Sequence, residues 1–182
     1  MVFVRTVKRV YEYRRHLPHY QSDHKAIFVT FSTHLRWRLP ESARTCALEA
    51  CLWGNGRRFS FHGVVIMPDH AHLAFTPLYD GHGFYSIVEI MQGIKSASAH
   101  RINQLLSRNG KVWQNESFDH VIRREENIMQ KVEYMMQNPL RAGLVSVSEK
   151  YRWAWSAEES ARARTLAPTS NVPAVTDKPG NY

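Results

Sequence analysis

The sequence predicts an α+β fold in which an antiparallel sheet carries helices packed on one face. Runs rich in β-branched and aromatic residues, typical of strands, alternate with longer segments whose apolar residues recur at helical spacing. The chain has 182 residues, of which 43% are hydrophobic. A chain of this length and composition can bury the core of one domain without disulfides or a structural metal.

The expected elements follow one another in the order β-α-β-β-α-β-α. They are a strand over 26–33, a helix over 40–53, strands over 59–67 and 71–76, a helix over 84–107, a strand over 118–123 and a helix over 125–138. Two β-α-β units in this order are typical of a ferredoxin-like sheet.

Turn and capping residues delimit these elements. Pro40 suits the start of the first helix, and the run Gly54-Asn55-Gly56 ends it. Pro68-Asp69 separates the second strand from the third, Asn109-Gly110 ends the long helix, and Pro139 follows the last helix.

The composition of the two ends divides the chain into three parts. Residues 1–24 are basic and are expected to form an N-terminal arm, whereas residues 25–156 form the domain. The domain includes a packed C-terminal extension around Tyr151–Trp155, where Trp153 and Trp155 are expected to be core or lid residues. Residues 157–182 are expected to be a disordered tail, because Ala, Pro, Thr, Ser and Asn dominate its sequence.

The charge balance favours a polyanionic partner, most simply nucleic acid. Lys and Arg number 24 against 16 Asp and Glu, so the net charge is +8. The longest apolar run, Val64–Met67, is far too short to span a membrane, and the first residues contain no apolar core of signal-peptide length. Two cysteines, Cys46 and Cys51, form no disulfide framework and fit a reducing cytosol.

The segment Met67–Phe75 carries the sharpest chemical signal. Its two histidines, His70 and His72, are two residues apart in an expected strand, so both imidazoles lie on one face while Ala71 points into the core. Two adjacent imidazoles can hold a divalent metal through neutral nitrogens. The alternative is a pair of polar residues on a solvated strand face.

The helix over 125–138 offers a second group of reactive side chains. Tyr134 and Asn138 are four residues apart and share a helical face, with Gln137 nearby. The phenol can serve as a nucleophile, and the carboxamide oxygen can be a third metal ligand. The alternatives are a core tyrosine and an ordinary residue at a helix end.

Five segments, in this order, resemble the single-tyrosine HUH transposases (the Y1 group, IS200-like), and most closely their REP-associated tyrosine transposases. They are Phe28–Thr33, Met67–His72, Trp113–Arg123, Tyr134–Val145 and Trp153–Ser156. The resemblance implies a fold of HUH endonuclease type. One departure is Ala71, which is small where the family often has a larger hydrophobic residue.

The resemblance also implies roles for individual residues. His70 and His72 match the family's metal ligands, Tyr134 its nucleophile and Asn138 its third ligand, with Gln137 as the less favoured choice. The implied cofactor is Mg²⁺ or Mn²⁺, although two imidazoles by themselves suit a softer metal such as Zn²⁺.

The implied activity is cleavage and rejoining of single-stranded DNA next to hairpin palindromes of the REP type, through a 5′-phosphotyrosine intermediate. The implied protein is bacterial, cytoplasmic and nucleoid-associated, and works as a monomer or homodimer without a membrane. Side chains expected to contact DNA are Lys95, Arg101, Arg108, Arg123, Arg124 and Arg141, each of which can instead be an ordinary surface charge.

Two other functions remain open from the residues. A basic domain of this kind can bind hairpin nucleic acid without cutting it. A metal-dependent hydrolase can use the two histidines to hold Zn²⁺ and water as the nucleophile. No HExxH or Cys-x-x-Cys pattern supports a dedicated zinc site.

Overall fold

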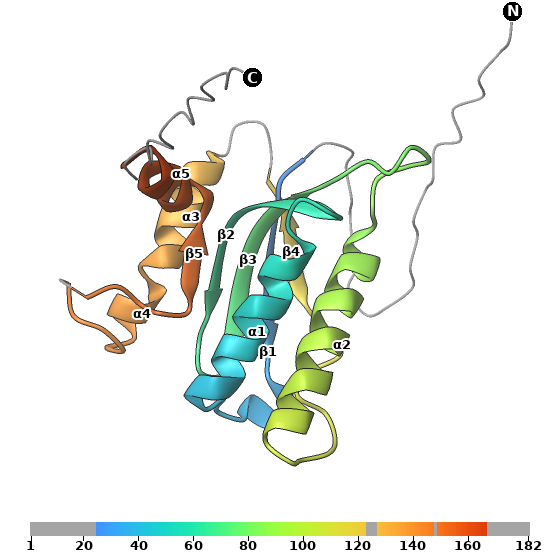
Figure 1. Ribbon diagram of the computed structural model, residues 1–182, viewed down its shortest axis with the longest axis vertical. Helices are drawn as coiled ribbons and strands as arrows, with labels where there is room; N and C mark the ends of the chain where they lie inside the picture. The colour runs from blue at the N-terminus through green and yellow to red at the C-terminus, as the bar shows by residue number, and fades with distance from the viewer. Residues whose placement is uncertain (1–24, 123–126, 148, 167–182) are drawn as a thin grey trace, which may run out of the picture.

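The computed structural model describes residues 25–122, 127–147 and 149–166. In chain order these form β1 (Ile27–Ser32), η1 (His34–Arg36), α1 (Glu41–Gly54), β2 (Phe59–Ile66), β3 (His70–Pro77), α2 (Ile87–Leu105), β4 (Phe118–Val121), α3 (Ile128–Met136), α4 (Asn138–Arg141), β5 (Ala154–Ser156) and α5 (Ala157–Leu166) (Figure 1). The predicted α+β class is confirmed. Within the described ranges, no helix has the length and apolar character needed to cross a bilayer.

The sheet has five strands in the order β4-β1-β3-β2-β5, and every neighbouring pair is antiparallel. The first four strands have the ferredoxin-like arrangement, in which β3 lies between β1 and β2. The fifth strand, β5, pairs with β2 at the sheet edge. The sequence predicts this segment only as a packed extension, because three residues are too few to show a strand period.

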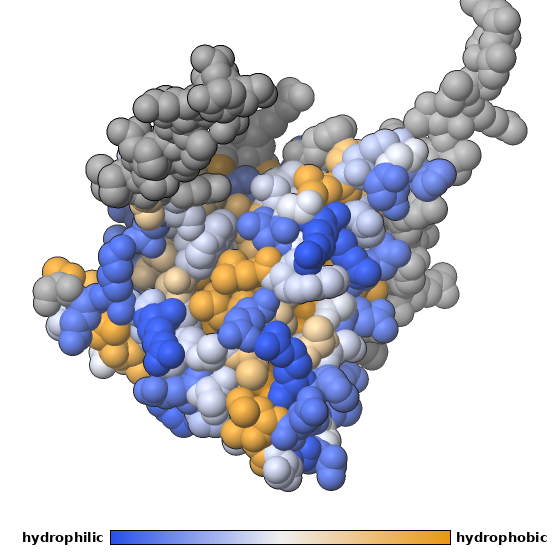
Figure 2. Space-filling model, in the orientation of Figure 1, coloured by the Kyte–Doolittle hydropathy of each residue, from blue (hydrophilic) through white to orange (hydrophobic). Residues whose placement is uncertain are grey.

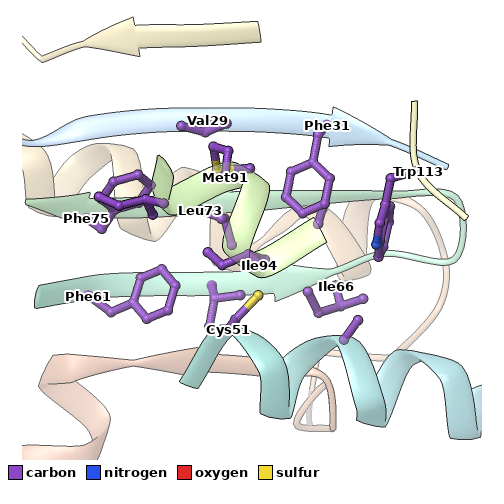
Figure 3. Packing of buried hydrophobic residues seen from close by; sticks show 14 of the residues in the cluster. Val29, Phe31, Cys51, Phe61, Ile66, Leu73, Phe75, Met91, Ile94 and Trp113 are labelled. Atoms are coloured by element: carbon purple, nitrogen blue, oxygen red, sulfur yellow. The ribbon is translucent and has the colours of Figure 1, made fainter. Parts of the chain in front are cut away.

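The main core lies between the sheet and the two long helices, α1 and α2. Alternate residues of the strands point into it, because successive side chains of a strand face opposite sides. Figure 3 shows Val29, Phe31, Phe61, Leu73 and Phe75 from three strands meeting residues of both helices. The outer surface over α1 and α2 mixes hydrophilic residues with apolar patches (Figure 2).

The opposite face of the sheet carries α3. Val132 and Met135 of this helix pack with Val65, Met67 and Ala74 in a second, smaller core. The expected packing of helices on one face therefore holds for α1 and α2, while α3 covers part of the other face. This placement matters because the same face of β3 carries His70 and His72.

The helix predicted over 125–138 is interrupted. Residues 123–126 lie outside the described residues, and α3 ends at Met136, with α4 beginning at Asn138. Pro139 explains the break, because it has no N–H to donate to the carbonyl four residues earlier. Tyr134 and Asn138 consequently belong to two consecutive helices rather than to one.

The segment predicted to be a disordered tail begins with a helix, α5, over Ala157–Leu166. The N–H of Glu159 donates to the Ser156 hydroxyl (3.3 Å), and Arg162 pairs with Glu158 one turn earlier. Such local contacts favour a helix even where the hydrophobic pattern is weak. The rest of that segment, and the basic arm over 1–24, lie outside the described residues.

The contact between α3 and the sheet depends on the absence of a side chain at Gly63. A Cβ atom at this position would lie 2.6 Å from Met135 Cε and 3.0 Å from Val132 Cγ1. We expect Gly63→Ala to lower the free energy of unfolding by about 1 kcal/mol, because the Met135 methyl can move aside whereas the β-branched Val132 must give way.

Gly93→Ala in α2 is the matched control. Its added Cβ would meet only Arg58 Nη1, at 3.4 Å, in a helix where alanine is preferred to glycine by about 0.5–1 kcal/mol. Urea unfolding of both variants measures the difference. Equal stability of the two variants would contradict the proposed tight approach of α3.

Candidate histidine and tyrosine site

The two histidines stand side by side at the start of β3. Their ring centroids are 4.8 Å apart, with the ring planes nearly perpendicular. Both rings are partly buried, on the face of the sheet opposite α1 and α2. Neighbouring residues Ala71 and Leu73 point into the main core. The predicted alternation along this strand is therefore what brings the two imidazoles together.

Each imidazole is held through its Nδ1 atom. The Nδ1 of His70 lies 2.7 Å from Asp69 Oδ1, and the Nδ1 of His72 lies 2.9 Å from Thr30 Oγ1. A carboxylate accepts the Nδ1 proton and leaves the Nε2 lone pair of His70 free. The Thr30 hydroxyl does the same for His72 in the tautomer with its proton on Nδ1.

The sequence reasoning missed Asp69 and Thr30 as partners of the histidines. Asp69 directly precedes His70, so its position could have signalled the contact. Thr30 could not be found in this way, because only the register of β1 against β3 places it opposite His72.

Asp69 is fixed from several sides. Its carbonyl accepts hydrogen bonds from the backbone N–H and the hydroxyl of Thr33, and its carboxylate forms an ion pair with Arg36 at 2.9 Å. Burial acts to raise the pKa of Asp69, but the hydrogen bond and charge of His70, together with the charge of Arg36, hold the pKa below its ordinary value. The group orienting His70 is therefore itself an ordered carboxylate.

His72 is partly enclosed by its neighbours. Phe28 stacks on it with ring centroids 5.7 Å apart. Burial, reinforced by the charge of His70, lowers the pKa of His72 from 6.5 to about 4. The ring is therefore neutral at pH 7, as a metal-ligating imidazole must be.

Tyr134 lies on the outer side of α3, away from the residues that pack on the sheet. Its side chain is 60% exposed, whereas Val132 and Met135 are buried. This exposure argues against the alternative that Tyr134 is a core tyrosine. An exposed phenol on a docked helix is available to a ligand.

Arg141 connects the residues expected to supply the nucleophile and the amide ligand. Its guanidinium carbon lies 4.0 Å from the centroid of the Tyr134 ring. Its Nη2 donates to Gln137 Oε1 at 2.9 Å, and its Nη1 donates weakly to Asn138 Oδ1 at 3.5 Å. The side chains of Tyr134 on α3, Gln137 between the helices and Asn138 on α4 are therefore arranged around one arginine.

The histidine pair and this arginine-centred group lie on the same face of the sheet. Val65 is the β2 partner of His72 in the strand register and packs in the same small core as Val132 and Met135. Within the described residues, no hydrogen bond joins Tyr134 or Asn138 to either histidine.

Three of the basic residues expected to contact DNA have partners within the protein. Lys95 Nζ lies 2.7–3.2 Å from three carbonyl oxygens and one hydroxyl of residues 114–117, which share its three N–H groups, and Arg101 pairs with Glu49 at 2.5 Å. Arg108 lies over Trp37 at 4.0 Å. All three belong to α2 or its end, on the other face of the sheet from the histidines.

Of the remaining basic candidates, Arg141 lies beside Tyr134, while Arg123 and Arg124 fall outside the described residues. Trp153 is buried in the main core, under the guanidinium of Arg44 at 3.6 Å, and Trp155 is partly buried against the same core. Both tryptophans have the packing role that the sequence predicts.

The fold has a counterpart among solved structures. A REP-associated tyrosine transposase bound to a REP hairpin superposes with a TM-score of 0.64, over 93% of this chain and 95% of that chain, at 23% identity. The chain shares the fold of this transposase. The resemblance found in the sequence motifs is thus confirmed at the level of the fold.

Other comparisons add little to this result. A Deinococcus radiodurans R1 protein matches over 65% of this chain and 92% of its own, with 13% identity and a TM-score of 0.42. No family model and no curated protein matches the chain.

The environment of His72 predicts a pH-dependent stability. The unfolded chain binds a proton on this histidine below pH 6.5, whereas the folded metal-free protein does so only near pH 4. The free energy of unfolding should therefore fall by up to about 3 kcal/mol as the pH drops from about 6.5 to about 4. NMR titration of the imidazole C2 protons, assigned with His72→Gln, measures this pKa. A midpoint near 6.5 would contradict it.

Proposed function

We propose that the protein is a metal-dependent, single-tyrosine transposase that cleaves and rejoins single-stranded DNA beside hairpins. The observation that carries this proposal is the pair of imidazoles, each held through Nδ1, on the sheet face that also carries the Tyr134 helix. The shared fold with a transposase bound to a REP hairpin supports hairpin DNA as the substrate class. The oligomeric state of this protein and its nucleoid association stay predictions.

The donor set fits a divalent metal. The described residues contain no cluster of three His, Cys, Asp or Glu side chains that could hold a metal, so the proposed set includes an amide oxygen. The ligands would be Nε2 of His70, Nε2 of His72 and the amide oxygen of Asn138. A mixed set of two imidazoles and one oxygen, completed by water, accepts Mg²⁺ or Mn²⁺. Bound there, the metal would neutralise charge that develops on the scissile phosphate.

Tyr134 performs the bond exchange in this proposal. Its Oη forms a bond to the phosphorus while the bond from phosphorus to the 3′ oxygen breaks; the phenol gives its proton to solvent, and the departing 3′ oxygen takes one up. The products are a 5′-phosphotyrosine and a free 3′-hydroxyl. Because one phosphodiester replaces another, a DNA 3′-hydroxyl can reverse the step and rejoin strands without a nucleotide cofactor.

Arg141 links the nucleophile and the amide ligand of this proposal. In the DNA-free protein its guanidinium covers the Tyr134 ring and contacts Asn138 Oδ1 at 3.5 Å. An amide oxygen has two lone pairs, so Asn138 can ligate a metal through one and keep this weak contact through the other. The exposed guanidinium can in addition bind a DNA phosphate, the role that the sequence predicts for Arg141.

The hydrogen bonds to the imidazoles yield a test that needs no DNA. We expect Thr30→Val and Asp69→Ala each to weaken Mn²⁺ binding by about 10- to 100-fold, because each removes the group that orients one ligand. Isothermal titration calorimetry with Mn²⁺ measures the affinity.

Thr76→Val is the control for that experiment, because Thr76 Oγ1 makes the same 2.9 Å contact to another imidazole, Nε2 of His62. It should leave the Mn²⁺ affinity unchanged. Equal losses of Mn²⁺ affinity in Thr76→Val and Thr30→Val would show that the effect is general destabilisation. This outcome would contradict the assignment of His72 as a metal ligand oriented by Thr30.

The nucleophile is tested by trapping a covalent product. A 3′-labelled hairpin oligonucleotide, incubated with the protein and Mn²⁺, should yield a label that moves with the protein on a denaturing gel. Tyr134→Phe and His70→Ala should abolish this adduct. Tyr151→Phe should keep it, since that phenol only donates to the Ile66 carbonyl and accepts from Arg44.

Other outcomes separate the alternative functions. Cleavage without an adduct would make water the nucleophile, as in the hydrolase alternative. Hairpin binding with neither cleavage nor adduct would leave a non-catalytic binding protein.

A further inference from the structure

A second group of exposed aromatic and basic side chains lies at the end of the sheet where β3 finishes. We call it the aromatic cluster; it consists of Trp53, Arg57, Arg58 and Tyr79. The histidines are at the other end of β3, and the eight residues of this strand (His70–Pro77) span roughly 23 Å. The cluster is therefore separate from the candidate catalytic site.

Backbone contacts hold the members of the aromatic cluster together. Trp53 is the penultimate residue of α1, and the N–H groups of Arg57 and Arg58 both donate to the Gly54 carbonyl at 3.1 Å. The Arg58 carbonyl in turn accepts from the N–H of Leu78 at 2.9 Å, directly before Tyr79. Three segments of the chain thus meet in one hydrogen-bonded corner.

The Trp53 ring combines an open surface with a fixed charge. It is 64% exposed, which is unusual for the largest aromatic side chain. The guanidinium carbon of Arg57 lies 4.4 Å from the ring centroid, and its Nη1 donates to the Trp53 carbonyl at 2.8 Å. A cation is thereby held beside an aromatic surface that remains available.

The Tyr79 ring is also exposed yet anchored. It is 60% exposed, packs edge-on against Phe84 at 5.4 Å, and donates its hydroxyl proton to the Gly81 carbonyl at 3.1 Å. The nearby carboxylate of Asp80 accepts from two backbone N–H groups of the same loop at 2.9 Å. The loop therefore presents a rigid ring and directs its one acidic group toward its own backbone.

We propose that the aromatic cluster binds unpaired nucleotides of a single-stranded nucleic acid. Bases stack on exposed aromatic rings, and an arginine beside such a ring, as Arg57 is beside Trp53, attracts the phosphates. The net charge of +8 supports a polyanionic partner. A duplex is a poorer match, because its base faces are covered by their neighbours and cannot stack on Trp53 or Tyr79.

This inference shares its partner class with the proposed function but uses none of its catalytic residues. A hairpin substrate has single-stranded flanks, and nucleotides away from the cut can reach the far end of the sheet. The aromatic cluster would then add affinity for the flank without contributing to the bond exchange.

The test measures binding alone. Anisotropy of a fluorescein-labelled oligothymidylate, and of a duplex of equal length, is followed with Tyr134→Phe protein in EDTA, so that neither cleavage nor metal contributes. Trp53→Ala and Tyr79→Ala should each weaken single-strand binding by about five-fold or more. Arg57→Ala should reduce the slope of log affinity against log salt by about 0.7.

Arg162→Ala is the matched control, since it removes one exposed charge from α5, which carries no member of the cluster. It should change single-strand affinity less than Arg57→Ala does. Trp53→Phe should retain most of the binding, because the stacking surface remains.

Three outcomes would overturn the proposal: no oligothymidylate binding by the parent protein, unchanged affinity in Trp53→Ala and Tyr79→Ala, or equal losses for single strand and duplex. Circular dichroism of each variant checks that its fold is kept. The proposed function is judged separately, by the covalent adduct that protein with Tyr134 intact forms.

Discussion

The alternation of side chains along β3 is the constraint on which the rest of the structure depends. This strand is central, so hydrogen bonds to β1 and β2 fix its register on both sides. Ala71, Leu73 and Phe75 fill the main core, and His70 and His72 consequently face the other way. A slip of one residue would bury both imidazoles among apolar side chains and expose Leu73. The energy of the core therefore also specifies the orientation of the histidine pair.

The tyrosine is positioned by a weaker and more local contact. Among the described residues, a small core centred on Val132 and Met135 holds α3 against the histidine face, and its close approach depends on Gly63. Pro139 then ends the helical hydrogen bonding, so that Asn138 starts a separate short helix. The two halves of the candidate site thus rest on different parts of the fold, one on the sheet and one on a docked helix.

The sequence could predict what depends on local pattern. Strand alternation placed His70 and His72 on one face, helical periodicity located α2, and capping and turn residues located α1. The sequence could not predict contacts that depend on strand register, or structure near the ends of the chain. Thr30 meets His72 only through the pairing of β1 with β3, and α5 forms where composition favours disorder. Tyr134 was assigned through resemblance, while its stacking with Arg141 needed the fold.

The same limit applies to the net positive charge. The role of each arginine depends on what its side chain contacts, which the sequence does not show. The guanidinium of Arg44 covers a buried tryptophan, and that of Arg108 covers a half-buried one, so both stabilise the fold. Arg141 and Arg57 instead cover Tyr134 and Trp53, two rings that are more than half exposed. A cation on an exposed ring gains less from burial and keeps its capacity to bind phosphate. The same pairing of side chains thus packs the fold in two places and leaves a cation on an exposed ring in two others.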